Sequence, residues 1–100
     1  MITSELSPDG RQLTIGVQGR FDFRVYDVFR STYAESSSSI DSYVVNLENA
    51  EYMDSSALGM LLLLREHAGG DSSNIQLRSP STEVRNVLNI ANFDKLFMIS

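Results

Sequence analysis

Three adjacent polar residues, Asp54, Ser55 and Ser56, stand shortly before the most hydrophobic stretch of the chain, Met60-Leu61-Leu62-Leu63-Leu64. This stretch predicts a buried helix, so the carboxylate and the two hydroxyls lie where that helix begins. A helix start leaves about four backbone N–H groups without partners and carries a partial positive charge. These properties favour Asp or Ser as a cap and tolerate a phosphate. The serines are therefore interpreted as caps, as a nucleophile or as a site of modification.

A serine nucleophile needs a base beside it, and the sequence offers no suitable one. The single histidine, His67, follows Ser56 by eleven residues, which is about 16 Å along the same helix. The single lysine, Lys95, lies in the C-terminal tail. We expect His67 in the last helical turn, where a cationic side chain interacts favourably with the helix dipole. The sequence therefore predicts a protein that is not an enzyme.

Metal and nucleotide sites are not predicted either. Glu48, Glu51 and Asp54 lack the ligand spacing of a calcium loop and have no His or Cys beside them. The glycines match neither the phosphate loop of nucleotide-binding proteins nor G-x-G-x-x-G. No cofactor is therefore expected. The remaining chemistry for an exposed serine is phosphorylation, which adds a charge of about −1.5 to −2 and three acceptor oxygens.

Length and composition predict one domain spanning residues 1–100, with an ordinary globular content of 42% hydrophobic and 21% charged residues. The formal net charge of −5 argues against direct binding to nucleic acid or to an anionic membrane. The longest apolar run has five residues, far fewer than the roughly twenty that span a bilayer, so no membrane insertion is expected. The sequence has no cysteine and no recognisable secretory signal, so we expect a cytoplasmic protein.

The elements before Asp54 follow from the periodicity of apolar residues. Residues 2–7 and 12–19 alternate at period two and predict an N-terminal hairpin. Helical spacing over residues 21–35 predicts a helix with Asp22 as its N-cap. Four serines at 36–39 then predict a surface loop, because serine competes for backbone hydrogen bonds.

The second half of the chain repeats the alternation of strand and helix. Residues 43–47 are β-branched and aromatic and predict a parallel strand, followed by a polar loop over 48–53. The apolar helix, 55–68, ends at Gly69-Gly70. A strand over 74–78 precedes a helix for which Ser79 is the expected cap and Pro80 the first residue. The apolar tail after residue 92 fits either a last short strand or a segment packed over the sheet.

This order predicts an α/β fold, with a four- to five-stranded mixed sheet packed with three to four helices. The N-terminal hairpin is antiparallel and the later strands are mainly parallel. Loops at the carboxyl ends of such strands form the working surface, where Asp54 lies. Within the apolar helix we expect Met60 or Leu63 to be exposed as a contact patch, and we expect most of the remaining leucines in the core: Leu58, Leu61, Leu62 and Leu64. Such a patch would bind a partner or a second copy, so a homodimer stays open.

The segment Met53-Asp54-Ser55-Ser56-Ala57-Leu58-Gly59 resembles the Asp-Ser-Ser-Gly-Leu-Gly signature of STAS domains of the bacterial anti-sigma factor antagonist family. Gly19-Arg20-Phe21-Asp22 is similar to the family's Gly-x-Leu-Asp at the end of its second strand. Residues 44–53 and 80–97 resemble the strand before the signature and the closing helix and tail, so the likeness covers essentially the whole chain. Two positions depart from the pattern: Ala57 replaces the signature glycine, and Asn46-Leu47-Glu48 stands where Asp-Leu-Ser is common.

The resemblance implies a non-enzymatic switch. Ser56 would be phosphorylated by a partner that is both a serine kinase and an anti-sigma factor, and a PP2C-type phosphatase would restore it. The unphosphorylated chain would bind that partner and release the sigma factor, while ATP and magnesium belong to the kinase. The implied partner-binding residues are Asp22, Asp54, Ser55, Ser56, Ala57 and Leu58.

Two alternatives accompany this implication. From the residues alone, the Ser55 hydroxyl is interpreted as a helix cap or a loop contact in preference to the modified group. At the level of the whole protein, the alternative is a STAS structural or regulatory subunit of a larger scaffold or transport assembly. In that case the serine never carries a phosphate.

Overall fold

A five-stranded sheet with the order β1-β2-β4-β6-β7 forms the centre of the computed structural model, which describes residues 1–35 and 39–100. β1 pairs antiparallel with β2, whereas the β2–β4, β4–β6 and β6–β7 pairs are parallel. The prediction of a mixed sheet with an N-terminal hairpin is confirmed. Residues 36–38 of the predicted serine loop lie outside the described residues. The strands are β1 (Ile2–Leu6), β2 (Gln12–Val17), β4 (Ser42–Asn46), β6 (Ile75–Arg78) and β7 (Met98–Ile99).

A second, two-stranded parallel sheet joins β3 (Gly19–Phe21) to β5 (Ala50–Met53). The prediction of a loop over 48–53 is wrong for residues 50–53, because Ala50–Met53 is a strand with buried residues at both ends. The predicted helix over 21–35 is wrong at its start, because Phe21 ends β3. Gly19 has a φ of 79°, in the left-handed region that favours glycine, and it redirects the chain between β2 and β3.

The described residues form three α-helices, within the predicted number. α1 (Tyr26–Ala34) is preceded by a 3₁₀ turn, η1 (Phe23–Val25). α2 (Ser55–His67) ends one residue before the predicted 68, with His67 in its last turn as expected. α3 (Thr82–Ile90) begins two residues later than predicted, because Ser81 caps it and Ser79 does not. Two further 3₁₀ turns are η2 (Gly70–Ser72) and η3 (Phe93–Lys95). The tail ends as the short strand β7, which settles the open alternative for these residues.

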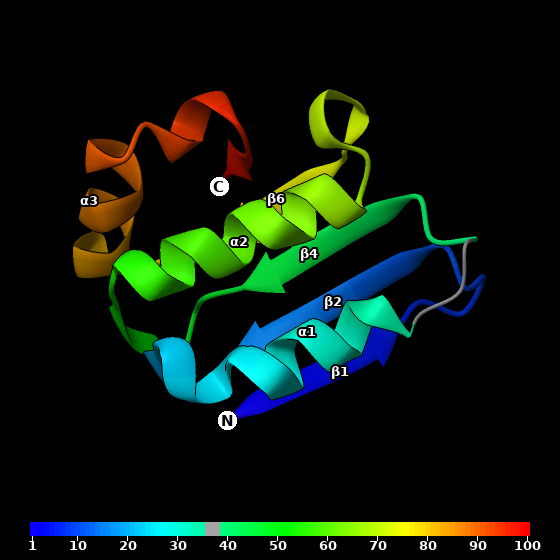
Figure 1. The fold of residues 1–100 in the computed structure, drawn as a ribbon, viewed down its shortest axis with the longest axis horizontal. Helices are drawn as coiled ribbons and strands as arrows, with labels where there is room; N and C mark the ends of the chain where they lie inside the picture. Colours follow the sequence, from blue (N-terminus) through cyan, green and yellow to red (C-terminus); the bar gives the residue numbers. More distant parts are fainter. Residues whose placement is uncertain (36–38) are drawn as a thin grey trace.

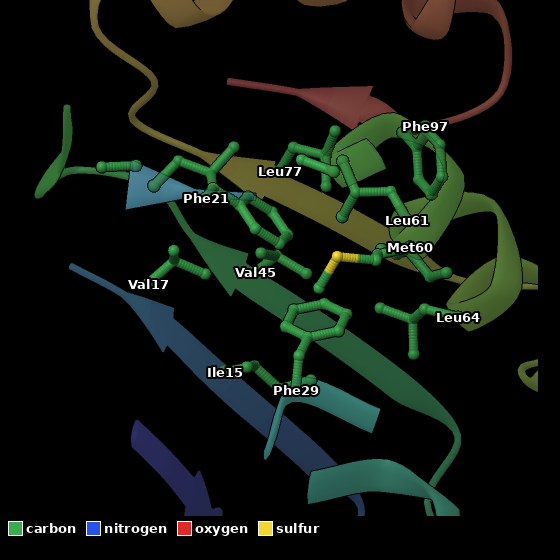
Figure 2. Close-up of a cluster of buried hydrophobic side chains, with 14 of the residues drawn as sticks. Ile15, Val17, Phe21, Phe29, Val45, Met60, Leu61, Leu64, Leu77 and Phe97 are labelled. Atoms are coloured by element: carbon green, nitrogen blue, oxygen red, sulfur yellow. The ribbon is translucent and has the colours of Figure 1, made fainter. Parts of the chain in front are cut away.

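Helices α1 and α2 lie across one face of the main sheet, and the arrowheads of β2 and β4 point toward the end where α2 starts and α3 stands (Figure 1). Between these helices and the sheet lies the core. Figure 2 shows these core side chains in one cluster. Phe29 comes from α1, Met60, Leu61 and Leu64 come from α2, and Ile15 and Val45 come from the strands. All of them are buried. Burial of such side chains, at about 25 cal/mol per Å² of apolar surface, is the main force that holds α2 on the sheet.

Only one side of α2 faces that core. Ala57, Met60, Leu61 and Leu64 recur at helical spacing and are its buried residues. Leu62 and Leu63 point the other way and remain 42% and 48% exposed. Most of the leucines expected in the core are therefore buried or half-buried, with Leu62 as the exception, and of the pair Met60 or Leu63 it is Leu63 that is exposed. None of the described helices is long and apolar enough to cross a membrane.

Candidate functional site

Two strand-to-helix connections lie side by side at the carboxyl edge of the small sheet. Phe21 of β3 is in register with Met53 of β5, and the next residues along the two chains are Asp22 and Asp54. Both aspartates have extended backbones, with φ of −141° and −126°, and each one caps the helix that follows it. Neighbouring strands are about 4.8 Å apart, so the pairing of β3 with β5 places Asp22 beside Asp54.

Asp54 is the N-cap of α2. Its Oδ1 accepts hydrogen bonds from the backbone N–H of Ser56 at 3.1 Å and of Ala57 at 3.3 Å. The same oxygen accepts a hydrogen bond from the Ser56 hydroxyl, with an Oγ–Oδ1 distance of 2.6 Å. One carboxylate therefore satisfies two free N–H groups of the helix start and fixes the orientation of the Ser56 side chain.

The two serines have different surroundings. The Ser56 side chain is half-buried, and its only described hydrogen bond is the one donated to Asp54, which leaves the lone pairs of Oγ available. Ser55 is exposed, and its hydroxyl makes no hydrogen bond with any residue that the structure describes. The predicted capping role of Ser55 is therefore wrong, because Asp54 performs it.

The other two residues of the signature face inward to different extents. Ala57 is fully buried in the core, so its methyl group offers no surface to a partner. Leu58 is half-buried and packs against the core cluster. Of the contact residues predicted on α2, only Ser55, Ser56 and part of Leu58 are accessible to a partner.

Asp22 is the one buried charged residue in the described chain, with an exposed fraction of 8%. Its carboxylate accepts hydrogen bonds from the Arg24 backbone N–H at 3.0 Å, from Arg24 Nη2 at 2.8 Å and from Arg20 Nε at 3.3 Å. The Arg24 side chain, its backbone N–H and the Arg20 guanidinium together hold the pKa of Asp22 well below its usual range. Asp22 is therefore ionised and paired with two arginines, which satisfies the requirement of a buried carboxylate for opposite charge and hydrogen bonds.

Arg20, Arg24 and Tyr52 were not predicted as part of this site. The Arg20 guanidinium carbon lies 3.9 Å from the centre of the Tyr52 ring, a cation–π contact between paired strands. For Arg20 the signal was present in Arg20-x-Asp22, because alternate residues of an extended segment share one face, whereas Arg24 reaches Asp22 from the 3₁₀ turn that Asp22 caps. The extended conformation of this segment follows only from its pairing with β5.

The exposed side of α2 continues away from Ser56 as a row formed by Gly59, Leu62 and Leu63. Gly59 lies inside the helix, yet a Cβ placed on it would meet no other atom within 4 Å. On the neighbouring η1, Phe23 is 69% exposed and stacks on Tyr26 with ring centres 5.5 Å apart. Exposed apolar side chains next to a polar helix start indicate a protein-binding surface.

No group of three or more His, Cys, Asp or Glu side chains in the described residues is placed to hold a metal ion. The geometry at Asp54 and Ser56 consists of a cap, an oriented hydroxyl and a compensated neighbouring carboxylate. Such an arrangement supports recognition or modification of the serine.

Comparisons with known proteins identify the family of the chain. The family model described as "Mlab, STAS domain" matches residues 4–100. A STAS-domain containing protein of Pseudomonas aeruginosa strain UCBPP-PA14, PA14_20770, is 54% identical over 99 residues, which are 99% of this chain and 98% of the relative.

Among solved structures, the anti-sigma factor antagonist SpoIIAA in its unphosphorylated form superimposes with a TM-score of 0.81 at 19% identity, over 100% of this chain and 88% of that chain. The phosphorylated form of SpoIIAA from Bacillus gives 0.77 at 19% identity, over 100% and 91%. A sulfate transporter family protein from Wolinella succinogenes gives 0.74 at 15% identity, over 94% and 80%. These structures share the fold, and together with the sequence match over nearly the full length they show that this chain belongs to the STAS domain family.

Proposed function

We propose that this chain is an anti-sigma factor antagonist controlled by phosphorylation of Ser56. Unphosphorylated, it binds a serine kinase that is also an anti-sigma factor, and the sigma factor is released. A PP2C-type phosphatase removes the phosphate. The chain acts in the cytoplasm by binding and has no turnover of its own.

The observation that carries the proposal is the Ser56 hydroxyl at the start of α2, oriented by Asp54 through a 2.6 Å hydrogen bond. Because the proton points to Asp54, the oxygen presents its lone pairs to an approaching phosphoryl group. Asp54 lies beside the hydroxyl and Asp22 follows the strand paired with β5, in line with both aspartates being part of the recognised surface. Exposed Phe23 and Leu63 supply apolar contact area near this edge.

Phosphorylation changes this site locally. The phosphorylated Ser56 oxygen has no proton, so it no longer donates a hydrogen bond to Asp54. A charge of about −1.5 to −2 appears beside that carboxylate. Two unit charges 4 Å apart repel by about 1 kcal/mol in water and about 4 kcal/mol near a protein surface. Attraction to the α2 dipole offsets about 0.3–2 kcal/mol of this repulsion. A partner that covers Ser56 must then desolvate three charged oxygens, which costs several kcal/mol without matching donors.

The relatives support both this proposal and its alternative. SpoIIAA, an anti-sigma factor antagonist, has been solved in unphosphorylated and phosphorylated forms with this fold. The sulfate transporter family protein has the same fold, which supports the alternative of a STAS subunit in a transport assembly. What favours the switch is the pair formed by an oriented serine and its carboxylate at an accessible helix start.

The test is incubation with the cognate serine kinase and ATP, followed by mapping of the phosphate by tandem mass spectrometry. We expect one phosphate on Ser56, none on the S56A variant and unchanged modification of the S55A control, because the Ser55 hydroxyl has no part in the cap. Full phosphorylation of S56A at another serine refutes the site. Absence of phosphate on any serine supports the transport or scaffold alternative, and equal partner binding with and without phosphate on Ser56 refutes the switch.

A further inference from the structure

A groove separates the start of α3 from the segments that lead into β3 and β5. It has a volume of about 810 Å³ and is lined by Gly19, Glu48, Ala50, Glu51 and Glu83 together with polar neighbours. A smaller hollow of about 230 Å³ adjoins it at Glu83 and is lined by Tyr52, Met53, Val84 and Val87. We call the two together the α3–β5 groove. Its larger part lies beyond the carboxyl ends of β2 and β4, at the amino ends of β3 and β5, and the smaller hollow extends to Met53, the residue before Asp54.

The rim of the α3–β5 groove is acidic and uncompensated. Glu48, Glu51 and Glu83 are exposed, and none of them forms an ion pair with a residue in the described part of the chain. No Lys or Arg is among the described residues that line the groove. Glu83 interacts with the dipole of α3 in its first turn, but Glu48 and Glu51 have no such role. The carboxylates of Glu48 and Glu51 can therefore attract a cation.

The floor of the α3–β5 groove is apolar. In the smaller hollow, Tyr52 is 38% exposed and Val87 is partly exposed, beside the buried side chains of Met53 and Val84. An apolar side chain placed over this floor removes further hydrocarbon surface from water. Carboxylates around a hydrocarbon floor match a peptide in which Lys or Arg flanks an apolar residue.

We propose that the α3–β5 groove docks a partner segment in which Lys or Arg side chains alternate with apolar side chains. The cations pair with Glu48, Glu51 and Glu83, and an apolar side chain packs in the smaller hollow against Tyr52 and Val87. Charge complementarity selects this occupant over a nucleic acid or an acidic peptide. The groove is continuous with the signature because Tyr52 and Met53 directly precede Asp54. The proposal does not depend on phosphorylation of Ser56.

The probe is the blocked pentapeptide acetyl-Lys-Val-Arg-Val-Lys-amide, added to ¹⁵N-labelled full chain and followed by ¹H–¹⁵N correlation spectra. We expect shifts concentrated at residues 48–53 and 81–87 and binding that weakens with added salt. The double variant E48Q/E51Q should raise Kd about 2- to 30-fold, the range for losing two exposed ion pairs.

The control E5Q/E35Q makes the same change in net charge with glutamates that do not line the groove. It should leave Kd within about twofold. Equal weakening by both double variants, or shifts spread over the surface, overturns the proposal because general charge attraction explains them. Equal binding of acetyl-Ser-Val-Ser-Val-Ser-amide overturns the role of the glutamates. Equal binding of acetyl-Lys-Ser-Arg-Ser-Lys-amide overturns the role of the floor.

Discussion

Replacement of Asp54 separates two contributions of its carboxylate, the hydrogen bonds of the cap and the negative charge. Asp54→Ala removes the acceptor for the N–H groups of Ser56 and Ala57 and for the Ser56 hydroxyl. Loss of an N-cap costs about 0.5–2 kcal/mol, and loss of an anion at a helix start costs about 0.3–1 kcal/mol. The expected loss of unfolding free energy is therefore about 1–3 kcal/mol.

Asp54→Asn keeps a capping oxygen and removes only the charge. Asn and Asp are about equally good N-caps, so the expected loss is about 0.3–1 kcal/mol. For a domain of about 100 residues, 1 kcal/mol shifts the thermal midpoint by roughly 4–8 °C. Asp54→Ala should therefore lower the midpoint by about 8–16 °C for a central loss of 2 kcal/mol, and Asp54→Asn by less than half of that.

Thermal unfolding and urea titration, both followed by circular dichroism, measure these differences. Ser55→Ala is the matched control on the next residue, because its exposed hydroxyl has no described hydrogen bond, and it should change stability by less than about 0.5 kcal/mol. If Asp54→Ala is as stable as the unmodified chain, the capping argument is refuted. If Asp54→Asn is as destabilising as Asp54→Ala, the charge dominates and the hydrogen bonds contribute little.

Two further predictions concern Gly59 and Asp22. Gly59→Ala should raise the free energy of unfolding by about 0.5–1 kcal/mol, because the helix gains a better former and the new Cβ meets no atom within 4 Å; a lower urea midpoint would contradict this. The pKa of Asp22 lies below its ordinary value of 3.8, so its ionisation stabilises the fold above the unfolded pKa and this contribution is lost as the pH falls through the folded pKa. The stability difference between the unmodified chain and Asp22→Asn, measured in urea, should therefore shrink between about pH 5 and pH 2, and a constant difference would show that the arginine contacts do not depend on the charge.

The main sheet and α2 could be predicted because their signals are local. Alternation over residues 12–17 and the apolar run from Met60 to Leu64 each identify an element without knowledge of its neighbours. The exposed position of Leu62 could not be predicted in the same way. It depends on α2 packing on the sheet with one side only, and the apolar run does not show which side that is.

The small sheet was missed for a different reason. Ala50–Met53 has buried residues only at its two ends, a pattern too short for a periodicity to indicate a strand, and its partner β3 has three residues. Their pairing is a tertiary event between segments about thirty residues apart. It is nevertheless the feature that places Asp22 beside Asp54. From the sequence, these two aspartates were brought to one site by the family resemblance alone.

The start of α3 shows how a local rule fails when two caps compete. Ser79-Pro80 satisfies the rule for a cap followed by proline, but Ser79 has a φ of 56° and its N–H donates to the carbonyl of Ser100. That bond ties the segment to the C-terminal residue after β7. The helix then begins after Ser81, whose hydroxyl accepts from the N–H of Val84 at 3.2 Å. The choice of Ser81 over Ser79 as the N-cap of α3 therefore depends on a tertiary contact, the one between Ser79 and Ser100.

The two aspartates of the site occupy equivalent positions and differ in electrostatics. Asp22 is paired with both Arg20 and Arg24, so this cluster of one carboxylate and two guanidinium groups is net positive, whereas the described partners of the Asp54 side chain are the N–H groups and hydroxyl of α2. A phosphate on Ser56 has the same sign as the rim of the α3–β5 groove, so long-range charge strengthens the attraction of a basic partner. Under the proposed switch, release of a partner that also occupies the groove therefore comes from lost fit at Ser56, where the hydroxyl and Asp54 lie.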